Sequence, residues 1–237
     1  MNWHDVDAAL LDLDGVITPT AEVHMRAWEV MFTRFLEGLP EEHDPYTDAD
    51  YFAHVDGRPR YEGVATFLAS RGIRLPQGEP SDGPDELTVS GLGNRKNDLF
   101  NEVLAQEGIE PYPGSVRLLD ELDRLGVAKA VVSSSKNATE VLRTAGLADR
   151  FEVVVDGVVA AEQGLAGKPE PDTFRYAAER LGVDPARCVV VEDAVSGVAA
   201  GAAGGFARVV GVDRGVGADT LREHGADEVV TDLAELV

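Results

Sequence analysis

The sequence predicts an α/β protein in which a parallel β-sheet is interrupted by a helical insertion after its first strand. Three observations predict this. A short apolar run at residues 8–13 ends in acidic residues, four further apolar runs rich in Val follow after residue 110, and the region between them has helical periodicity. Short β-branched runs that alternate with helices are typical of βα units. We therefore expect a core domain formed by residues 1–18 and 108–237, and a helical insertion that forms a second domain at residues 19–107.

Apolar spacing defines the first strand and the helix after it. Residues 8–13 are apolar except for Asp12, as expected of a strand buried on both faces, and Asp14-Gly15 ends the run. From residue 20 to residue 36, apolar side chains recur at helical spacing, and Thr20 suits a helix N-terminus. We expect a long amphipathic helix here.

The rest of the insertion is less regular. Periodicity predicts helices at residues 60–71 and 97–106. Residues 76–93 between them are rich in Gly and Pro. A stretch of this length without clear periodicity is more often functional or mobile than purely connective.

Four apolar runs beyond residue 110 predict the remaining strands. They are residues 128–134, 151–156, 188–193 and 207–212, and helices fall between them. Crossovers between such parallel strands should be right-handed, and open α/β sheets bind ligands beyond the carboxyl ends of their strands. That edge of the sheet is where we expect the functional residues.

Composition and charge exclude several classes of function. The chain has 237 residues, 44% of them hydrophobic and 27% charged, which is typical of a soluble globular protein. Its 21 Lys and Arg against 43 Asp and Glu give a net charge of −22, which disfavours nucleic acid as a partner. No apolar run approaches the ~20 residues of a membrane helix, and the first residues have no signal-peptide pattern. We expect a cytoplasmic protein without a membrane partner, as a monomer or weak homo-oligomer.

Polar side chains follow the ends of the predicted strands. Asp12 and Asp14 stand two apart, so both carboxylates turn toward the same side as the chain leaves the sheet. A hydroxyl, an ammonium group and two more carboxylates follow at later strand ends or loops. In chain order the residues at this edge are Asp12, Asp14, Ser133, Lys168, Glu192 and Asp193.

These residue types indicate phosphoryl transfer. Asp12 is the expected nucleophile, and Asp14 is the expected general acid and base. Ser133 and Lys168 would hold the phosphate oxygens. Several carboxylates beside a phosphate repel it unless a cation is present, and an all-oxygen site selects Mg²⁺ over zinc. The chain has one cysteine, Cys188, and no Cys/His cluster with zinc spacing, so we expect Mg²⁺ as the cofactor.

The order of these motifs resembles the haloacid dehalogenase superfamily and, within it, the β-phosphoglucomutase-like branch. The residues that carry the resemblance are DLDGVIT at 12–18, Ser133, Lys168-Pro169 and Glu192-Asp193, and the likeness extends over the whole chain. It implies a Rossmann-like parallel sheet with a mobile helical cap. It also implies that magnesium is held by Asp12, by the main-chain carbonyl of Asp14 and by Asp193, with Glu192 as an auxiliary acid of the metal site.

The same resemblance implies substrate-binding residues. His24 lies in the segment TAEVHMRAW, which is similar to the start of the cap in the β-phosphoglucomutase branch. Lys96 and Asn97 match cap residues that contact the sugar phosphate, and Arg60 matches an arginine that holds the distal phosphate. Ser135, Lys136 and Asn137 match residues near the phosphoryl group that is transferred.

Structural alternatives stand beside these assignments. His24 shares a helical face with Trp28 and Met31 and could be a packed histidine. Arg60 could be a solvated helix residue, and Lys96 could simply start a helix. Two features depart from the family pattern: Pro19 stands where close relatives carry an acidic residue, and the Gly/Pro-rich segment is long.

The resemblance implies an isomerase that converts β-glucose 1-phosphate to glucose 6-phosphate through a bisphosphorylated intermediate. A phosphorylated sugar is then the small-molecule partner. The main alternative is a sugar-phosphate phosphatase that uses the same residues with water as the acceptor. A non-catalytic phosphosugar-binding protein is a third hypothesis, which the presence of both Asp12 and Asp14 disfavours.

Overall fold

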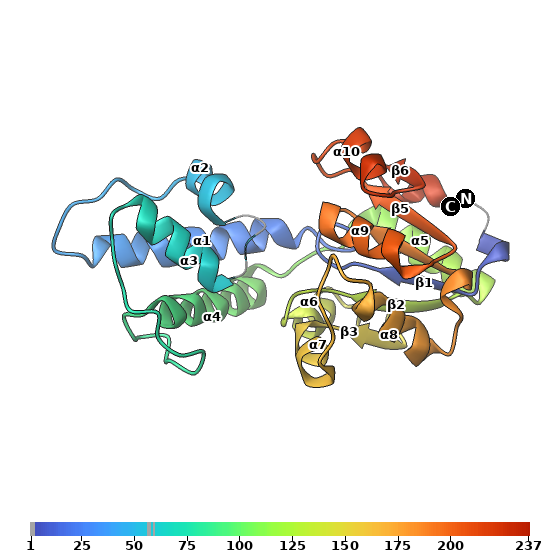
Figure 1. The fold of residues 1–237 in the computed structure, drawn as a ribbon, viewed down its shortest axis with the longest axis horizontal. Coiled ribbons are helices and arrows are strands. Elements are labelled where there is room, and N and C mark those ends of the chain that lie inside the picture. The colour runs from blue at the N-terminus through green and yellow to red at the C-terminus, as the bar shows by residue number, and fades with distance from the viewer. Residues whose placement is uncertain (1–2, 56–57, 59) are drawn as a thin grey trace. The chain divides into compact units, whose positions relative to one another are not determined.

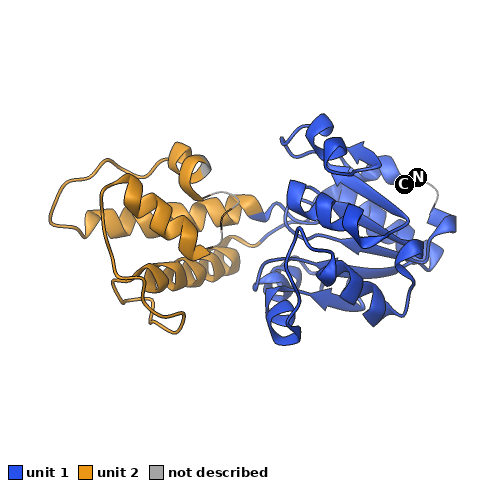
Figure 2. Cartoon of the chain, in the orientation of Figure 1, with its two compact units in different colours: residues 1–20, 109–237 blue, residues 21–108 orange. Residues whose placement is uncertain are grey.

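The computed structural model describes residues 3–55, 58 and 60–237. The chain forms two compact units (Figure 2). One, called the core unit here, holds the residues up to Thr20 and from Ile109 onward, and the other, called the cap unit, is Ala21–Gly108. Sequence analysis places the insertion at residues 19–107, so the two sets of boundaries lie within two residues of each other.

The core unit contains a six-stranded parallel sheet with the order β3-β2-β1-β4-β5-β6 (Figure 1). In the central register, Leu11 of β1 pairs with Val131 of β2 and Val191 of β4. The residues that follow these three strands therefore emerge side by side. The strands are β1 (Ala8–Leu11), β2 (Ala128–Val132), β3 (Val153–Val155), β4 (Cys188–Glu192), β5 (Arg208–Val212) and β6 (Glu228–Val230). The predicted α/β class with a parallel sheet is confirmed.

Helices cover both faces of this sheet. Phe174 of α8 and Val198 of α9 pack into one cluster with Leu10 and Val190, while α5 lies on the opposite face (Figure 1). Every residue of β1 and β4 is buried, which explains their apolar sequences. The core helices are α5 (Pro113–Leu125), α6 (Ala138–Thr144), α7 (Gly157–Gln163), α8 (Asp172–Leu181), α9 (Val195–Gly204) and α10 (Ala218–Glu223), with 3-10 turns at Trp3–Asp5, Ala148–Arg150, Pro185–Arg187 and Leu233–Leu236.

The cap unit is helical, and aromatic side chains fill its centre. The Phe32 ring of the first helix lies with its centroid 3.9 Å from that of Phe67, and the Trp28 ring stacks on Phe32 at 5.3 Å. The helices are α1 (Thr20–Glu37), which starts directly after Pro19, α2 (Asp48–Asp50), α3 (Arg60–Ser70) and α4 (Val89–Glu107), with a π-helical turn at Tyr51–Val55. The helices predicted at 20–36 and 60–71 correspond to α1 and α3.

Helix α4 begins at Val89, not at residue 97 as the sequence predicts. Gly91 and Gly93 have low helix propensity, so the sequence pattern does not show that the helix already begins before them. The Thr88 side chain caps it by accepting a hydrogen bond from the Gly91 N–H at 2.9 Å. Gly93 lies against the Tyr61 ring of α3, where any side chain would collide with that ring. Close helix packing therefore overrides local propensity.

Short strands also differ from the prediction. The first strand ends at Leu11, two residues before the predicted end, because Asp12 and Leu13 already belong to the loop. The strand predicted at 151–156 is limited to Val153–Val155. The sequence does not predict β6, because three residues at the sheet edge are too few to give an apolar run. Among the described residues, no helix combines the length and the apolarity that a bilayer crossing requires.

The Gly/Pro-rich segment before α4 folds back onto that helix. Asn94 Nδ2 donates to the carbonyl oxygens of Pro80 at 3.1 Å and Asp82 at 2.8 Å, and its Oδ1 accepts from the Tyr61 hydroxyl at 3.0 Å. Arg95 Nε donates to the Pro84 carbonyl at 2.7 Å. The side-chain amide of Asn94 in α4 thus connects the Gly/Pro-rich segment to α4 and to Tyr61 of α3.

We expect Asn94→Ala to destabilise the protein by about 1–3 kcal/mol, because it removes three hydrogen bonds, two of which are partly buried. Chemical denaturation monitored by circular dichroism measures this change. The neighbouring variant Arg95→Ala is the control, since it removes a single exposed hydrogen bond. Equal stability of the two variants would contradict the role assigned to Asn94.

Candidate active site

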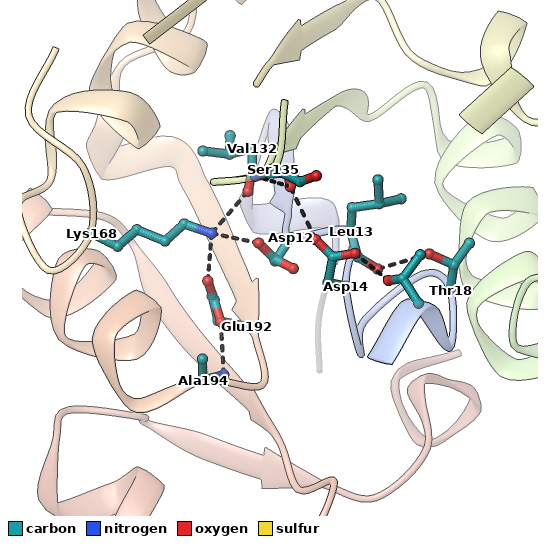
Figure 3. Close-up of polar contacts among 11 residues, drawn as sticks. Asp12, Leu13, Asp14, Thr18, Val132, Ser135, Lys168, Glu192 and Ala194 are labelled. Atoms are coloured by element: carbon teal, nitrogen blue, oxygen red, sulfur yellow. Dashed lines mark hydrogen bonds and ion pairs between the residues drawn. The ribbon is translucent and has the colours of Figure 1, made fainter. Parts of the chain in front are cut away.

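The ammonium group of Lys168 joins three strands at the carboxyl edge of the sheet (Figure 3). Its Nζ lies 2.5 Å from Asp12 Oδ1, 2.6 Å from Glu192 Oε1 and 2.9 Å from the Val132 carbonyl oxygen. The three charged side chains are at most 9% exposed. An ammonium group has three donors, and these acceptors use all of them. A phosphate oxygen could therefore bind Lys168 only by replacing one acceptor.

The sheet positions these side chains through main-chain hydrogen bonds beyond the strand ends. The Asp12 N–H donates to the Val191 carbonyl at 2.9 Å, and the Ser133 N–H donates to the Val155 carbonyl at 2.9 Å. Lys168 comes from the loop before α8, and its Nζ lies 4.9 Å from the centroid of the Phe174 ring. Residues that are far apart in the sequence thus meet at one point.

Two hydroxyl groups hold the carboxyl group of Asp14. Thr20 Oγ1 donates to one oxygen, and Ser133 Oγ donates to the other at 3.2 Å. Burial raises the pKa of Asp14, and the two hydroxyl hydrogen bonds partly oppose this rise. A fixed carboxyl group with a raised pKa is suited to give and take a proton.

Burial also shifts the pKa values of the other ionisable groups at this edge. It raises the pKa of Asp12 well above its ordinary value, against the lowering effect of Lys168. Burial lowers the pKa of Lys168, but Asp12 and Glu192 outweigh it and the net shift is upward. Burial, with Glu192 and Asp14 nearby, raises the pKa of Asp193 to about 7. Four carboxyl groups lie near the single ammonium group of Lys168, so in their ionised forms they carry more negative charge than Lys168 neutralises.

The donor set at this edge fits a hard divalent cation, because it consists of carboxylate and main-chain oxygens with excess negative charge. The Asp193 carboxyl group lies against Gly15, whose φ of 81° and missing side chain leave it room. Both Glu192 oxygens have other partners, namely Lys168 and the Ala194 N–H at 2.8 Å. In the described part of the chain, no three His, Cys, Asp or Glu side chains form a ready-made metal site. A cation would therefore need main-chain or water oxygens besides carboxylates.

The turn after β2 contains the predicted residues 133–137. Ser133 Oγ accepts a hydrogen bond from the Ser135 N–H at 3.0 Å, and Ser135 Oγ accepts one from the Asn137 N–H at 3.1 Å. Asn137 directly precedes α6, and Lys136 is exposed. These residues lie in the core unit and continue the strand that carries Val132.

The predicted cap residues form a separate cluster within the cap unit. Lys96 is 4% exposed, its Nζ donates to His24 Nδ1 at 2.6 Å, and it lies 5.1 Å from the ring centroids of Trp28 and Phe100. The His24 and Phe100 rings stack with centroids 4.4 Å apart. Lys96 lies inside α4 rather than at a helix start.

Burial and the neighbouring cations favour the neutral form of His24. Burial lowers the pKa of His24 well below its ordinary value, and the nearby cations Lys96 and Arg60 lower it further. Because an ammonium group only donates, His24 Nδ1 accepts and the ring proton is on Nε2. Arg60 Nη2 donates to Asn97 Oδ1 at 2.8 Å. His24 is therefore both packed and polarised, so the structural and functional interpretations are compatible.

Sequence analysis missed two residues that contact the loop after β1. Thr20 is assigned there only to a helix start, but its hydroxyl binds Asp14. Arg214 Nε donates to the Gly15 carbonyl at 2.7 Å. Arg214 follows β5, so the rule that selects polar residues at strand ends would have found it. No comparable sequence signal marks the Thr20 contact.

The chain is similar to known proteins over nearly its whole length. Residues 6–205 match a family model described as haloacid dehalogenase-like hydrolase. A β-phosphoglucomutase of Mycobacterium bovis is 51% identical over 241 residues, which cover 98% of this chain and 92% of that protein. Hexitol phosphatase A of Escherichia coli is 31% identical, covering 96% and 91%.

The fold has close structural neighbours. The crystal structure of a putative β-phosphoglucomutase from Thermotoga maritima superposes with a TM-score of 0.75 at 26% identity. The likeness covers 97% of this chain and 96% of that one, so it includes both the sheet and the inserted helices.

The raised pKa of Asp193 predicts a pH-dependent stability. A carboxyl group whose pKa rises on folding, here from 3.8 to about 7, stabilises the folded state less as the pH increases through that range. In protein treated with a chelator, we expect Asp193→Asn to raise the melting temperature relative to wild type at pH 8, and to raise it less at pH 5. Thermal unfolding followed by circular dichroism measures both differences.

The control for this prediction is Asp219→Asn, which alters an exposed acid on α10. We expect that variant to differ from wild type by the same small amount at both pH values. A pH-independent effect of Asp193→Asn would contradict the prediction.

Proposed function

The chain belongs to the haloacid dehalogenase-like hydrolase family, and we propose that it is a metal-dependent β-phosphoglucomutase that converts β-glucose 1-phosphate to glucose 6-phosphate. The contact of the Lys168 ammonium with Asp12 and Glu192 supports the phosphoryl-transfer chemistry most directly. The 51% identity to the mycobacterial relative, which covers 98% of this chain, supports the choice of reaction and substrate.

In the proposed reaction, Asp12 carries the phosphoryl group. One carboxylate oxygen bonds to phosphorus while the bond between phosphorus and the sugar oxygen breaks, which forms an acyl phosphate on Asp12. Asp14 gives its proton to the departing sugar oxygen. In the reverse transfer, Asp14 takes the proton of the sugar hydroxyl that attacks the phosphorus. Thr20 and Ser133 keep the Asp14 carboxyl group in position for both steps.

Two such transfers move the phosphate between carbons. Phosphorylated Asp12 passes its phosphoryl group to the C6 hydroxyl of β-glucose 1-phosphate, which gives the 1,6-bisphosphate. The C1 phosphoryl group is then transferred back to Asp12, and glucose 6-phosphate leaves. The enzyme returns to its phosphorylated state, so a trace of the bisphosphate is enough to start the cycle.

We infer that Mg²⁺ is the metal. Phosphatases and mutases of this family are generally metal-dependent, and the oxygen donors favour a hard cation. Asp12, Asp193 and the main-chain carbonyl of Asp14 are the groups that we expect to hold it. When bound, it would neutralise the charge between the phosphate and the carboxylates. Glu192 fixes Lys168 and acts on the metal only indirectly.

A sugar-phosphate phosphatase is the second candidate. The similarity to a hexitol phosphatase favours it, because the same Asp12 and Asp14 can transfer the phosphoryl group to water. The two reactions differ in the acceptor that reaches the acyl phosphate. A phosphosugar-binding protein without activity is disfavoured, because both aspartates are present and Asp14 is held by two hydroxyl groups.

The decisive assay offers β-glucose 1-phosphate with a trace of glucose 1,6-bisphosphate and Mg²⁺, and follows glucose 6-phosphate and inorganic phosphate separately. We expect glucose 6-phosphate to form, a chelator to stop the reaction, and Asp12→Asn to abolish it because an amide oxygen is a poor nucleophile. Release of inorganic phosphate without glucose 6-phosphate would select the phosphatase instead. Activity of Asp12→Asn equal to wild type would exclude an acyl phosphate on this residue.

The cap cluster predicts a second, separable effect. Because Lys96 lowers the pKa of His24, we expect Lys96→Met to raise that pKa, as measured by NMR titration. Loss of one charge-assisted contact to the sugar phosphate should also lower kcat/KM ~10-fold. Met preserves the apolar packing on Trp28 and Phe100. The control is Arg26→Met, an exposed residue of α1, and an unchanged kcat/KM in Lys96→Met would exclude the substrate role.

A further inference from the structure

The loop after β5 brings a guanidinium group to the same sheet edge as the proposed site. Arg214 Nε donates to the Gly15 carbonyl at 2.7 Å, and its Nη1 donates to the Thr231 carbonyl at 3.0 Å. The guanidinium carbon lies 3.9 Å from the centroid of the Tyr112 ring. Three segments that are distant in the sequence therefore hold this one side chain in a defined position.

Arg214 is presented by a loop that is itself braced. The Asp213 Oδ1 atom accepts hydrogen bonds from the N–H groups of Gly215 at 2.9 Å and Gly217 at 3.0 Å. These two bonds close a tight turn directly after β5. The guanidinium group thus projects from a fixed support rather than from a freely moving loop.

The group that Arg214 binds is adjacent in sequence to Asp14. Beyond Gly15 the loop is anchored again, since Ser115 Oγ donates to the Val16 carbonyl at 2.6 Å and the Tyr112 N–H donates to the Ile17 carbonyl at 2.9 Å. Arg214 supplies the charged donor in this series, and such hydrogen bonds are stronger than those between neutral groups. The Gly15 peptide links Asp14 to the anchored part of the loop.

We propose that Arg214 is a positioning residue for proton transfer: by fixing the Gly15 peptide, it holds the Asp14 carboxyl group in line with the sugar oxygen. This inference rests on the role proposed for Asp14 as general acid and base. A misplacement of about 1 Å at a reacting group can slow a reaction ~100-fold, so a single main-chain contact can matter for the rate. In this arrangement, Arg214 contacts neither the reacting atoms nor the carboxyl groups of Asp12 and Asp193, which are expected to hold the metal.

The test compares Arg214→Ala with wild type on two substrates that differ in their need for a proton. The sugar leaves a sugar phosphate as an alcohol, so its oxygen requires a proton. The leaving group of 4-nitrophenyl phosphate is 4-nitrophenolate, a stable anion that requires none. We expect kcat for the sugar phosphate to fall ~10- to 100-fold with little change in KM. The pre-steady-state burst of 4-nitrophenolate, which reports transfer to Asp12 before any acceptor is deprotonated, should slow less than ~3-fold. Arg214→Lys, which keeps a charged donor, should recover part of the sugar-phosphate rate.

The matched control is Arg208→Ala. Arg208 is the first residue of β5, the strand that precedes Arg214, and it forms a surface ion pair with Glu228. We expect its kinetics to equal those of wild type. An unchanged kcat in Arg214→Ala overturns the proposal. Equal losses on both substrates, or no recovery in Arg214→Lys, also overturn it, because a purely structural role would affect both reactions alike.

This outcome is distinguishable from failure of the proposed function. If wild-type protein releases inorganic phosphate and forms no glucose 6-phosphate, the mutase assignment is wrong. The contrast between leaving groups still tests Arg214 in that case, because hydrolysis of a sugar phosphate needs the same proton from Asp14.

Discussion

The buried contact between the Lys168 ammonium and the carboxylates of Asp12 and Glu192 is the interaction on which the rest of the core unit depends. Charges that are removed from water are tolerated only when they are paired and hydrogen-bonded, and here each donor of the ammonium has an acceptor. The parallel register of β1 with β4 brings the two acids together. The same contact that stabilises this edge also fixes the position of the Asp12 carboxyl group, so structure and chemistry have a common origin.

Excess negative charge at this edge links the site to its ligands. Lys168 compensates part of the charge of Asp12, Asp14, Glu192 and Asp193. Burial, with the neighbouring acids adding to it, raises the pKa values of Asp12, Asp14 and Asp193. A phosphate group adds further negative charge, so a cation is needed for both to occupy the same edge. The cap cluster has the opposite character: burial lowers the pKa of His24, and the cationic side chains of Lys96 and Arg60 lower it further.

Contacts around the reactive groups explain how a loop can hold a side chain in a defined position. Asp14 lies in a loop, yet Thr20 and Ser133 hold its carboxyl group, while Arg214, Ser115 and the Tyr112 N–H hold the main chain that follows. Helix α4 in the cap unit follows the same logic, because the packing of Tyr61 on Gly93 and the bonds of Asn94 define its start. In both units, contacts with side chains of neighbouring elements determine local structure that sequence propensity alone does not determine.

Local chemistry and periodicity are enough to identify the α/β class, the strands β1, β2, β4 and β5, the helices α1 and α3, and the motif residues from Asp12 to Asp193, because these follow from residue type and spacing along the chain. The tertiary structure decided the rest: the three acceptors of Lys168, the bond from Thr20 to Asp14, the pairing of Lys96 with His24, the early start of α4 and the edge strand β6. Each of these depends on which residues, distant in sequence, come into contact when strands align in register and helices pack. Spacing along a single chain does not contain that information.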